Sequence, residues 1–223
     1  MRGRALPRKA LQRTRSFPFE GDSLALLYVY TMTHDTGFAP HVDRSGRFLT
    51  LATCKPKIRA VAKLGDWIMG IAGVARLDGS RRGRVVYLAE VTRDPSTFSD
   101  YFSAAEFQGR LDNIYWRNGS FHQVKNPFHG PEQVDHDTSA DSVLISERFV
   151  YFGRQGPSLG DSGFADLVWF APGHTKWTIE PDSVADSMIR DATVRWRGWN
   201  RWLPPSEDDT RGCDESCGSG EEG

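Results

Sequence analysis

Apolar residues occur along the chain in short runs and alternations, a pattern that favours strands over long helices. Residues 23–33 are rich in Leu, Tyr and Val, which predicts a buried strand. Residues 66–73 predict a second strand that is apolar on both faces, and residues 84–92 alternate apolar and polar positions. Because a glycine-containing, arginine-rich turn separates these two runs, we expect them to form an antiparallel hairpin.

Helical spacing is confined to three segments. Residues 55–64 place apolar side chains at helical intervals, and residues 96–107 form a short amphipathic pattern with Ser96 or Thr97 as N-cap. Residues 182–203 predict a C-terminal helix. Further strand-like runs lie at 142–146, 149–153 and 167–170. These elements predict an α+β fold, with a small curved, barrel-like, mostly antiparallel sheet and flanking short helices.

Two segments, 34–50 and 109–141, have no regular period and are dense in His, Asp, Gly and aromatic residues. Long irregular segments in a compact domain are usually functional or disordered. Their composition does not suit a linker, so we expect them to form the walls of a pocket.

The charges of this 223-residue chain are unevenly distributed. Residues 1–20 hold six basic residues and one acidic residue, and residues 206–223 hold seven acidic residues and one basic residue. We therefore expect a disordered basic arm at 1–20 and a disordered acidic tail at 205–223, around one domain at 21–204. The arm could be a transit-like segment, an arm that binds nucleic acid or an over-long start. The domain has balanced charge, so any affinity for nucleic acid must come from a local patch.

The three cysteines do not suit a secreted, disulfide-bonded fold. Cys54 stands alone, and Cys213 and Cys217 lie in the acidic tail without the second ligand pair of a zinc site. Because the cysteines do not form a disulfide framework, we expect a protein of the reducing cytoplasm. No apolar stretch of the sequence approaches the length needed to span a bilayer. No phosphate-binding loop, dinucleotide fingerprint or zinc-deaminase signature is present, so no cofactor is predicted.

Cys54 is the first candidate for chemistry. Adjacent cations stabilise a thiolate, and Lys55 follows Cys54 directly, with Lys57 two residues further on. A nucleophile would need a base such as His34 or His136, whereas a buried spacer between strand and helix would not. We favour the spacer at this point.

Basic and aromatic residues provide the binding candidates. Lys55, Lys57 and Arg59 are expected to hold phosphates, although a solvated cationic face would look the same. A flipped base needs a ring to stack on and an Asp or Asn to pair with its edge. The candidates of this second kind are Asp35, Phe38, Asp112, Asn113 and Tyr115.

A metal site is not predicted. His129, His136 and Asp137 have a spacing that fits no helix face or familiar ligand pair. Asp35, His136 and Asp137 remain candidates for acid–base work beside Cys54.

Several motifs in order resemble those of one family. They are HDTGFAP, LATCKPKIR, GDWIMG, VVYLAEVT, DNIYW, DTSADSVLISERFVYFG and GHTKW, which together cover about residues 24–202. The chain is similar through them to the nucleotide-modification-associated domain of the second type, a bacterial and phage family associated with DNA base hypermodification. Residues 24–105 also resemble, in architecture, the small β-barrels of PUA-like domains of the EVE and ASCH kind.

The resemblance implies a nucleic-acid setting. The expected partners are DNA or a modified nucleotide, with RNA in its place as an alternative, and enzymes of the same modification system. Two functions stay open. One is a module that recognises a base in a pocket, and the other is an enzyme that alters the base with Cys54 and a nearby Asp or His.

Overall fold

The computed structural model describes residues 24–32, 34–73, 83–158 and 174–180, together with residues 186, 187 and 189. The expected arm and tail, the hairpin tip at 74–82, the strand at 167–170 and most of the expected C-terminal helix lie outside the described residues.

The largest sheet contains five strands in the order β10-β1-β4-β5-β9. β1 and β4 are parallel, and the other neighbours are antiparallel. The antiparallel pairing of β4 with β5 confirms the hairpin that the sequence predicts. The five strands are β1 (Ala25–Met32), β4 (Trp67–Ala72), β5 (Val85–Glu90), β9 (Arg148–Tyr151) and β10 (His174–Ile179).

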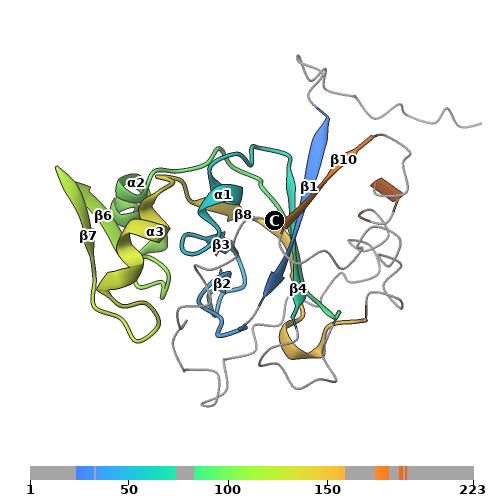
Figure 1. Ribbon diagram of the computed structural model, residues 1–223, viewed down its shortest axis with the longest axis horizontal. Helices are drawn as coiled ribbons and strands as arrows, with labels where there is room; N and C mark the ends of the chain where they lie inside the picture. Colours follow the sequence, from blue (N-terminus) through green and yellow to red (C-terminus); the bar gives the residue numbers. More distant parts are fainter. Residues whose placement is uncertain are drawn as a thin grey trace, which may run out of the picture.

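Two smaller sheets and several short helices lie to one side of the large sheet (Figure 1). One sheet has the order β2-β3-β8, and β6 and β7 form a separate hairpin at the far end of the molecule. The smaller strands are β2 (His41–Val42), β3 (Leu49–Leu51), β8 (Leu144–Ser146), β6 (Tyr115–Asn118) and β7 (Ser120–Gln123). The helices are α1 (Pro56–Arg59), α2 (Phe98–Ser103) and α3 (Val134–Thr138), with 3₁₀ turns at Ala105–Phe107, Pro131–Gln133 and Gly153–Gln155.

The core on one face of the large sheet joins it to α1 and to the three-stranded sheet. Tyr30 and Tyr87 belong to this core, and the Tyr87 hydroxyl donates to the Tyr30 hydroxyl at 3.0 Å. Gly70 makes room for the Tyr87 ring and the Met32 side chain, because a Cβ there would lie 2.4 Å from both Met32 Sδ and Tyr87 Cε1. A side chain at this position would overpack the core.

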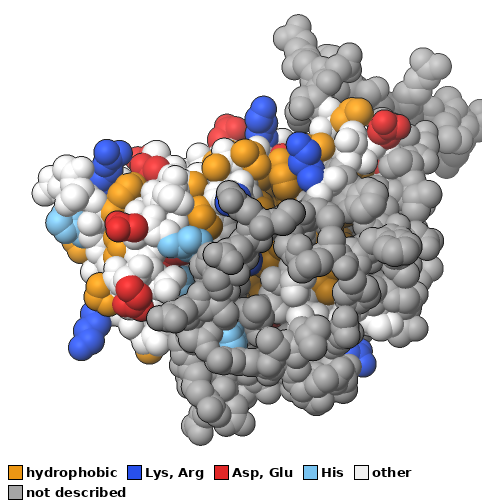
Figure 2. Space-filling view, in the orientation of Figure 1, with side chains coloured by type: hydrophobic (Ala, Val, Ile, Leu, Met, Phe, Trp, Pro, Cys, Tyr) orange, Lys and Arg blue, Asp and Glu red, His pale blue; other side chains and the backbone are white. Residues whose placement is uncertain are grey.

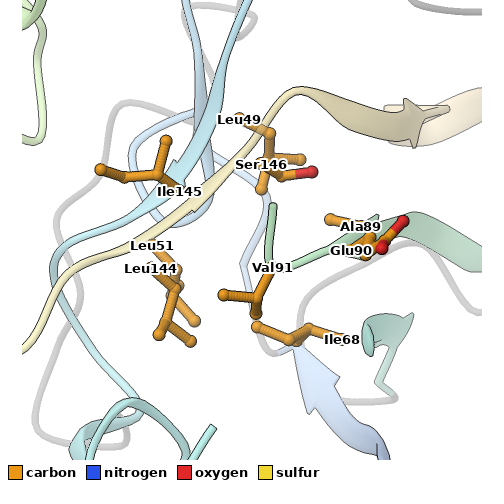
Figure 3. Close-up of a pocket in the computed structure, with 9 residues that line it drawn as sticks. All are labelled: Leu49, Leu51, Ile68, Ala89, Glu90, Val91, Leu144, Ile145 and Ser146. Atoms are coloured by element: carbon orange, nitrogen blue, oxygen red, sulfur yellow. The ribbon is translucent and has the colours of Figure 1, made fainter. Parts of the chain in front are cut away.

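A small apolar hollow marks the seam between the two sheets (Figure 3). Figure 3 shows Leu49, Leu51 and Leu144 on one side of the hollow and Ile68 and Val91 on the other. Its lining contains few polar groups and none of the expected site residues, so we interpret it as a packing gap rather than a substrate pocket.

The α+β class is confirmed, but the strands that the structure describes form three separate sheets and no closed barrel. The segment 109–141 is also more regular than expected. It contains the β6–β7 hairpin, in which Gly119 adopts a φ of +75° directly after Asn118. Asn-Gly is a strong hairpin signal, and here it lies between short strands that are mostly polar and aromatic.

Candidate active site

Cys54 lies in a strained turn between β3 and α1. The φ angles of Cys54 and Lys55 are 56° and 44°, so two consecutive residues with side chains are left-handed. Such conformations cost free energy and persist where the surroundings enforce them. The Cys54 N–H donates to Asp137 Oδ1 at 2.8 Å, and Arg59 Nε donates to the Cys54 carbonyl at 2.8 Å. The turn therefore holds the thiol in a fixed position.

The Cys54 thiol, the His129 imidazole and the Asp137 carboxylate form a line of contacts. Cys54 Sγ lies 3.5 Å from His129 Nε2, and His129 Nδ1 lies 2.6 Å from Asp137 Oδ2. The exposed fractions of the three residues are 7%, 2% and 0%. The cysteine is thus the outermost member, and the carboxylate is the innermost.

This arrangement can activate a nucleophile. When Asp137 accepts the proton on Nδ1, the neutral imidazole has Nε2 available to accept a proton from the thiol. A nucleophile, a base and a group that orients the base are the three parts that covalent catalysis uses.

Asp137 is held as a carboxylate by its surroundings. Burial alone would raise the pKa of Asp137, but hydrogen bonds from His129 and His136, the charge of His129 and a hydrogen bond from Tyr115 lower it well below its usual value. The Tyr115 hydroxyl donates to Asp137 Oδ2 at 2.8 Å. Burial and the charge of Asp137 in turn raise the pKa of Tyr115, so this tyrosine remains a donor.

Arg59 is buried behind the site rather than displayed on the surface. Its guanidinium donates to the carbonyls of Cys54, Asp137, Ala140 and Ser142, which ties the turn at Cys54 to the end of α3. Burial lowers the pKa of Arg59 to about 10, so it stays charged at neutral pH. Arg59 was expected to hold a phosphate together with Lys55 and Lys57, but its guanidinium contacts backbone carbonyls inside the protein, and α1 is shorter than the helix expected at 55–64.

We call Cys54, His129 and Asp137 the relay, and other residues expected at the site lie around it. Phe38 is fully buried and packs edge-on against His129, with ring centroids 4.9 Å apart. Lys55 lies with its ammonium 5.1 Å from the centre of the Tyr30 ring, and Lys57 is exposed. Asp35 is buried and accepts a hydrogen bond from the Tyr151 hydroxyl.

His136 lies next to the Asp137 carboxylate, but it does not occupy the position between Asp137 and Cys54. Its Nδ1 lies 3.4 Å from Asp137 Oδ1, on the oxygen that does not contact His129. His34 belongs to the described residues, yet the histidine whose ring contacts the Cys54 sulfur is His129.

Asp112 and Asn113 belong to a different buried cluster. Asp112 accepts hydrogen bonds from Thr50 at 2.5 Å and Tyr101 at 2.9 Å, and it lies 3.6 Å from Arg110 Nε. Asn113 donates to the carbonyls of Tyr101 and Phe107. Both side chains are engaged in the fold, away from the line of contacts at Cys54.

Cys54, His129 and Asp137 also form a group that could be considered for a metal ion. However, Cys54 and Asp137 contact opposite nitrogens of one imidazole, so they do not converge on the same point from this ring. An ion bound to His129 Nε2 could have Cys54 as a second ligand, whereas Asp137 would only orient the ring through Nδ1. Two direct ligands are too few for a structural or catalytic zinc site, so the geometry suits a proton relay better.

His129 is the functional residue that sequence reasoning did not select as the base. It follows the hairpin, and its partners are 75 residues earlier and 8 residues later in the chain. The signal present was a lone cysteine with separated His and Asp residues, which becomes specific only when the fold brings them together.

Comparison with known proteins gives one family match. A model described as nucleotide modification associated domain 2 matches residues 24–190. No curated protein matches the chain, and no solved structure matches it. Within the part of the chain that the structure describes, no helix has the length and apolar character needed to cross a membrane.

Proposed function

The chain belongs to the nucleotide modification associated domain 2 family, and we propose that it is a cysteine-dependent enzyme acting on a nucleotide or a nucleic-acid base. The observation that carries the proposal is the contact of Cys54 with His129, whose other nitrogen is held by Asp137. A module that only recognises a nucleobase needs neither a thiol nor a histidine placed to accept the proton of that thiol. The arrangement therefore favours the second of the two functions that the sequence leaves open.

The reaction that fits these groups is transfer at an electrophilic carbon through a thiol-bound intermediate. His129 takes the proton of Cys54 as the sulfur attacks, and a carbon–sulfur bond forms. The protonated imidazole then gives this proton to the leaving group as its bond to carbon breaks. An acceptor, water or an amine or hydroxyl of a second substrate, next gives a proton to His129 and displaces the sulfur. The protonated His129 returns this proton to the departing sulfur, so the thiol and the neutral imidazole are both regenerated, and no electron is gained or lost overall.

The neighbouring residues support this chemistry by position. Arg59 and Asp137 hold the strained turn from two sides, so the sulfur stays in place between turnovers. Lys55 follows the nucleophile directly and is partly exposed, which suits it to meet a phosphate of the substrate. Tyr115 and Phe38 confine the relay and limit the access of water to it.

The test is to trap the intermediate. The purified protein, with Cys213 and Cys217 replaced by Ser, is incubated with nucleotides and with oligonucleotides that carry unmodified or modified bases. The reaction is quenched in acid, and intact mass spectrometry with peptide mapping locates any added group. The expected result is an adduct on Cys54 that Cys54→Ser and His129→Gln prevent.

The control is Val124→Ala, because Val124 has an exposed side chain just after β7 and is not one of the residues assigned to binding or chemistry. It should leave adduct formation unchanged. If substrates bind with the same affinity to the wild type and to Cys54→Ser, and no adduct or product forms with any of them, the protein is a recognition module and the proposal fails.

A further inference from the structure

Three aromatic rings are stacked on the outer side of the β6–β7 hairpin. The Trp116 ring lies between Phe102 of α2 and His122 of β7, with centroids 5.0 and 5.2 Å apart and interplanar angles of 30° and 20°. Phe102 and Trp116 are partly exposed, and His122 is exposed. We call these three residues the aromatic stack.

The two faces of the hairpin have different tasks. Tyr115 and Gln123 pair across the strands next to Trp116 and His122, and their side chains point to the opposite face. Tyr115 donates to Asp137, and Gln123 donates to the Tyr115 hydroxyl and to the carbonyl of His129. The inner face therefore supports the relay, while the outer face presents stacked rings to solvent.

The stretch of chain that forms the hairpin carries basic residues and no acidic ones, while neighbouring elements add acidic side chains at the same end of the molecule (Figure 2). Residues 113–131 contain Arg117, Lys125 and two histidines but no acidic residue. Arg117 and Lys125 are exposed, and the Arg117 guanidinium lies 5.3 Å from the centre of the Phe121 ring. The folded part of the chain has balanced charge, so this acid-free stretch of 19 residues is a local feature.

We infer that the aromatic stack binds single-stranded nucleic acid, with a base stacked on the exposed end of the rings. The exposed cations Arg117 and Lys125, which belong to the same stretch of chain, favour the approach of its phosphates. Unpaired bases offer a π-face that stacks on aromatic side chains, whereas bases inside a duplex do not. The inference rests on the proposed function and sharpens it. The substrate is then a base within a strand, held by the hairpin that also supports the relay, rather than a free nucleotide.

The test measures binding of the full chain to a fluorescein-labelled oligothymidylate of about 12 nucleotides, by anisotropy at low salt. Arms with oligouridylate, with a duplex and with thymidine monophosphate separate DNA, RNA, paired and monomeric ligands. Trp116→Ala and His122→Ala should each weaken binding to the strand on the order of tenfold, since stacking on one base is worth about 1–3 kcal/mol.

Two controls keep this result specific. Val124→Ala removes an exposed apolar side chain just after β7 and should leave binding unchanged. Trp116→Phe keeps a ring in the middle of the stack and should restore most of the affinity if stacking, rather than hairpin stability, is what Trp116→Ala removes.

The outcomes separate this inference from the proposed chemistry. If His122→Ala and Trp116→Ala bind the strand as tightly as Val124→Ala does, the inference is overturned. If duplex or monophosphate binds as well as the strand, it is overturned too. Loss of strand binding with adduct formation at Cys54 intact on free nucleotides would leave the enzyme proposal standing. Strand binding that depends on the aromatic stack, without an adduct at Cys54 for any ligand, would support the inference and contradict the enzyme proposal.

Discussion

Asp112 and Asp137 are both buried carboxylates that accept hydrogen bonds from a tyrosine, yet they sit in different kinds of site. The partners of Asp112 are Thr50, Tyr101 and the guanidinium of Arg110, which is permanently charged. The partners of Asp137 include His129, which can gain or lose a proton and has a thiol on its other nitrogen. A buried acid therefore does not identify a site by itself. The chemistry available to its partner does.

The backbone separates the two clusters in the same way. Cys54 and Lys55 are held in left-handed conformations beside Asp137. Thr50, by contrast, is an ordinary residue of strand β3. Strain of this kind is concentrated at functional sites, so the cluster at Cys54 is the one we expect to be sensitive in activity, and the cluster at Asp112 in stability.

The largest effect on activity is expected for Cys54→Ser. The hydroxyl is nearly the same size as the thiol but a much weaker nucleophile, so adduct formation or turnover should fall by at least about 10³-fold. The free energy of unfolding should change by less than about 1 kcal/mol, as measured by urea denaturation. A variant that keeps its activity would contradict the relay as the reactive group.

Asp112→Ala should have the opposite profile. It removes the buried carboxylate beside Arg110 and leaves the guanidinium with the partly exposed Asp43 alone, which should lower the free energy of unfolding by about 3 kcal/mol. The rate constant for the chemical step, measured well below the new melting temperature, should stay within a factor of about three. If the rate fell as far as in Cys54→Ser with stability unchanged, the two clusters would have to exchange roles.

Arg59→Lys tests whether the hydrogen bonds of Arg59, which join the turn at Cys54 to the end of α3, are needed. An ammonium cannot reach all four carbonyls that the planar guanidinium contacts. We expect a loss of about 2 kcal/mol in the free energy of unfolding and a smaller loss of reactivity at Cys54. Lys57→Ala, which changes an exposed cation on the same short helix, is the control and should alter neither quantity measurably.

The smallest effect concerns acid stability. The pKa of Asp137 is lower in the folded protein than in the unfolded chain, so the unfolded chain takes up this proton first as the pH falls. The stabilisation from Asp137 is thus complete above about pH 4 and is lost progressively below it. Denaturant titrations at pH 7 and pH 3 should show a smaller pH-dependent loss for Asp137→Asn than for the wild type. An unchanged loss would mean that other carboxylates carry the effect.

Much of the fold could be predicted because its signals are local. The apolar runs gave β1, β4 and β5, and Thr97 caps α2 by accepting from the Asp100 N–H, as its position before the helix suggests. The barrel-like sheet was predicted, but the described strands form three separate sheets, because closure depends on pairing between distant short strands that local patterns do not specify. The hairpin at 115–123 was missed because its strands are mostly polar and aromatic, although Asn118-Gly119 signals the turn.

The site was only partly predictable for a similar reason. Cys54 and Asp137 were candidates from residue type alone, but the base between them depends on how the segment after β7 folds back. His136 looked suitable because it adjoins Asp137, yet the first turn of α3 points it at the other carboxylate oxygen. Arg59 looked like a surface cation because charge usually faces water, whereas its guanidinium finds four carbonyls inside.

The most direct test of the account is the rate at which iodoacetamide alkylates Cys54 at pH 7, in a chain with Cys213 and Cys217 replaced by Ser. Wild-type His129 should accept the thiol proton, so His129→Gln should slow the reaction on the order of a hundredfold, whereas His122→Gln should not change it. Circular dichroism would confirm that each variant is folded. Equal alkylation rates in the wild type and in folded His129→Gln would contradict the claim that Cys54 and His129 act as a nucleophile and its base.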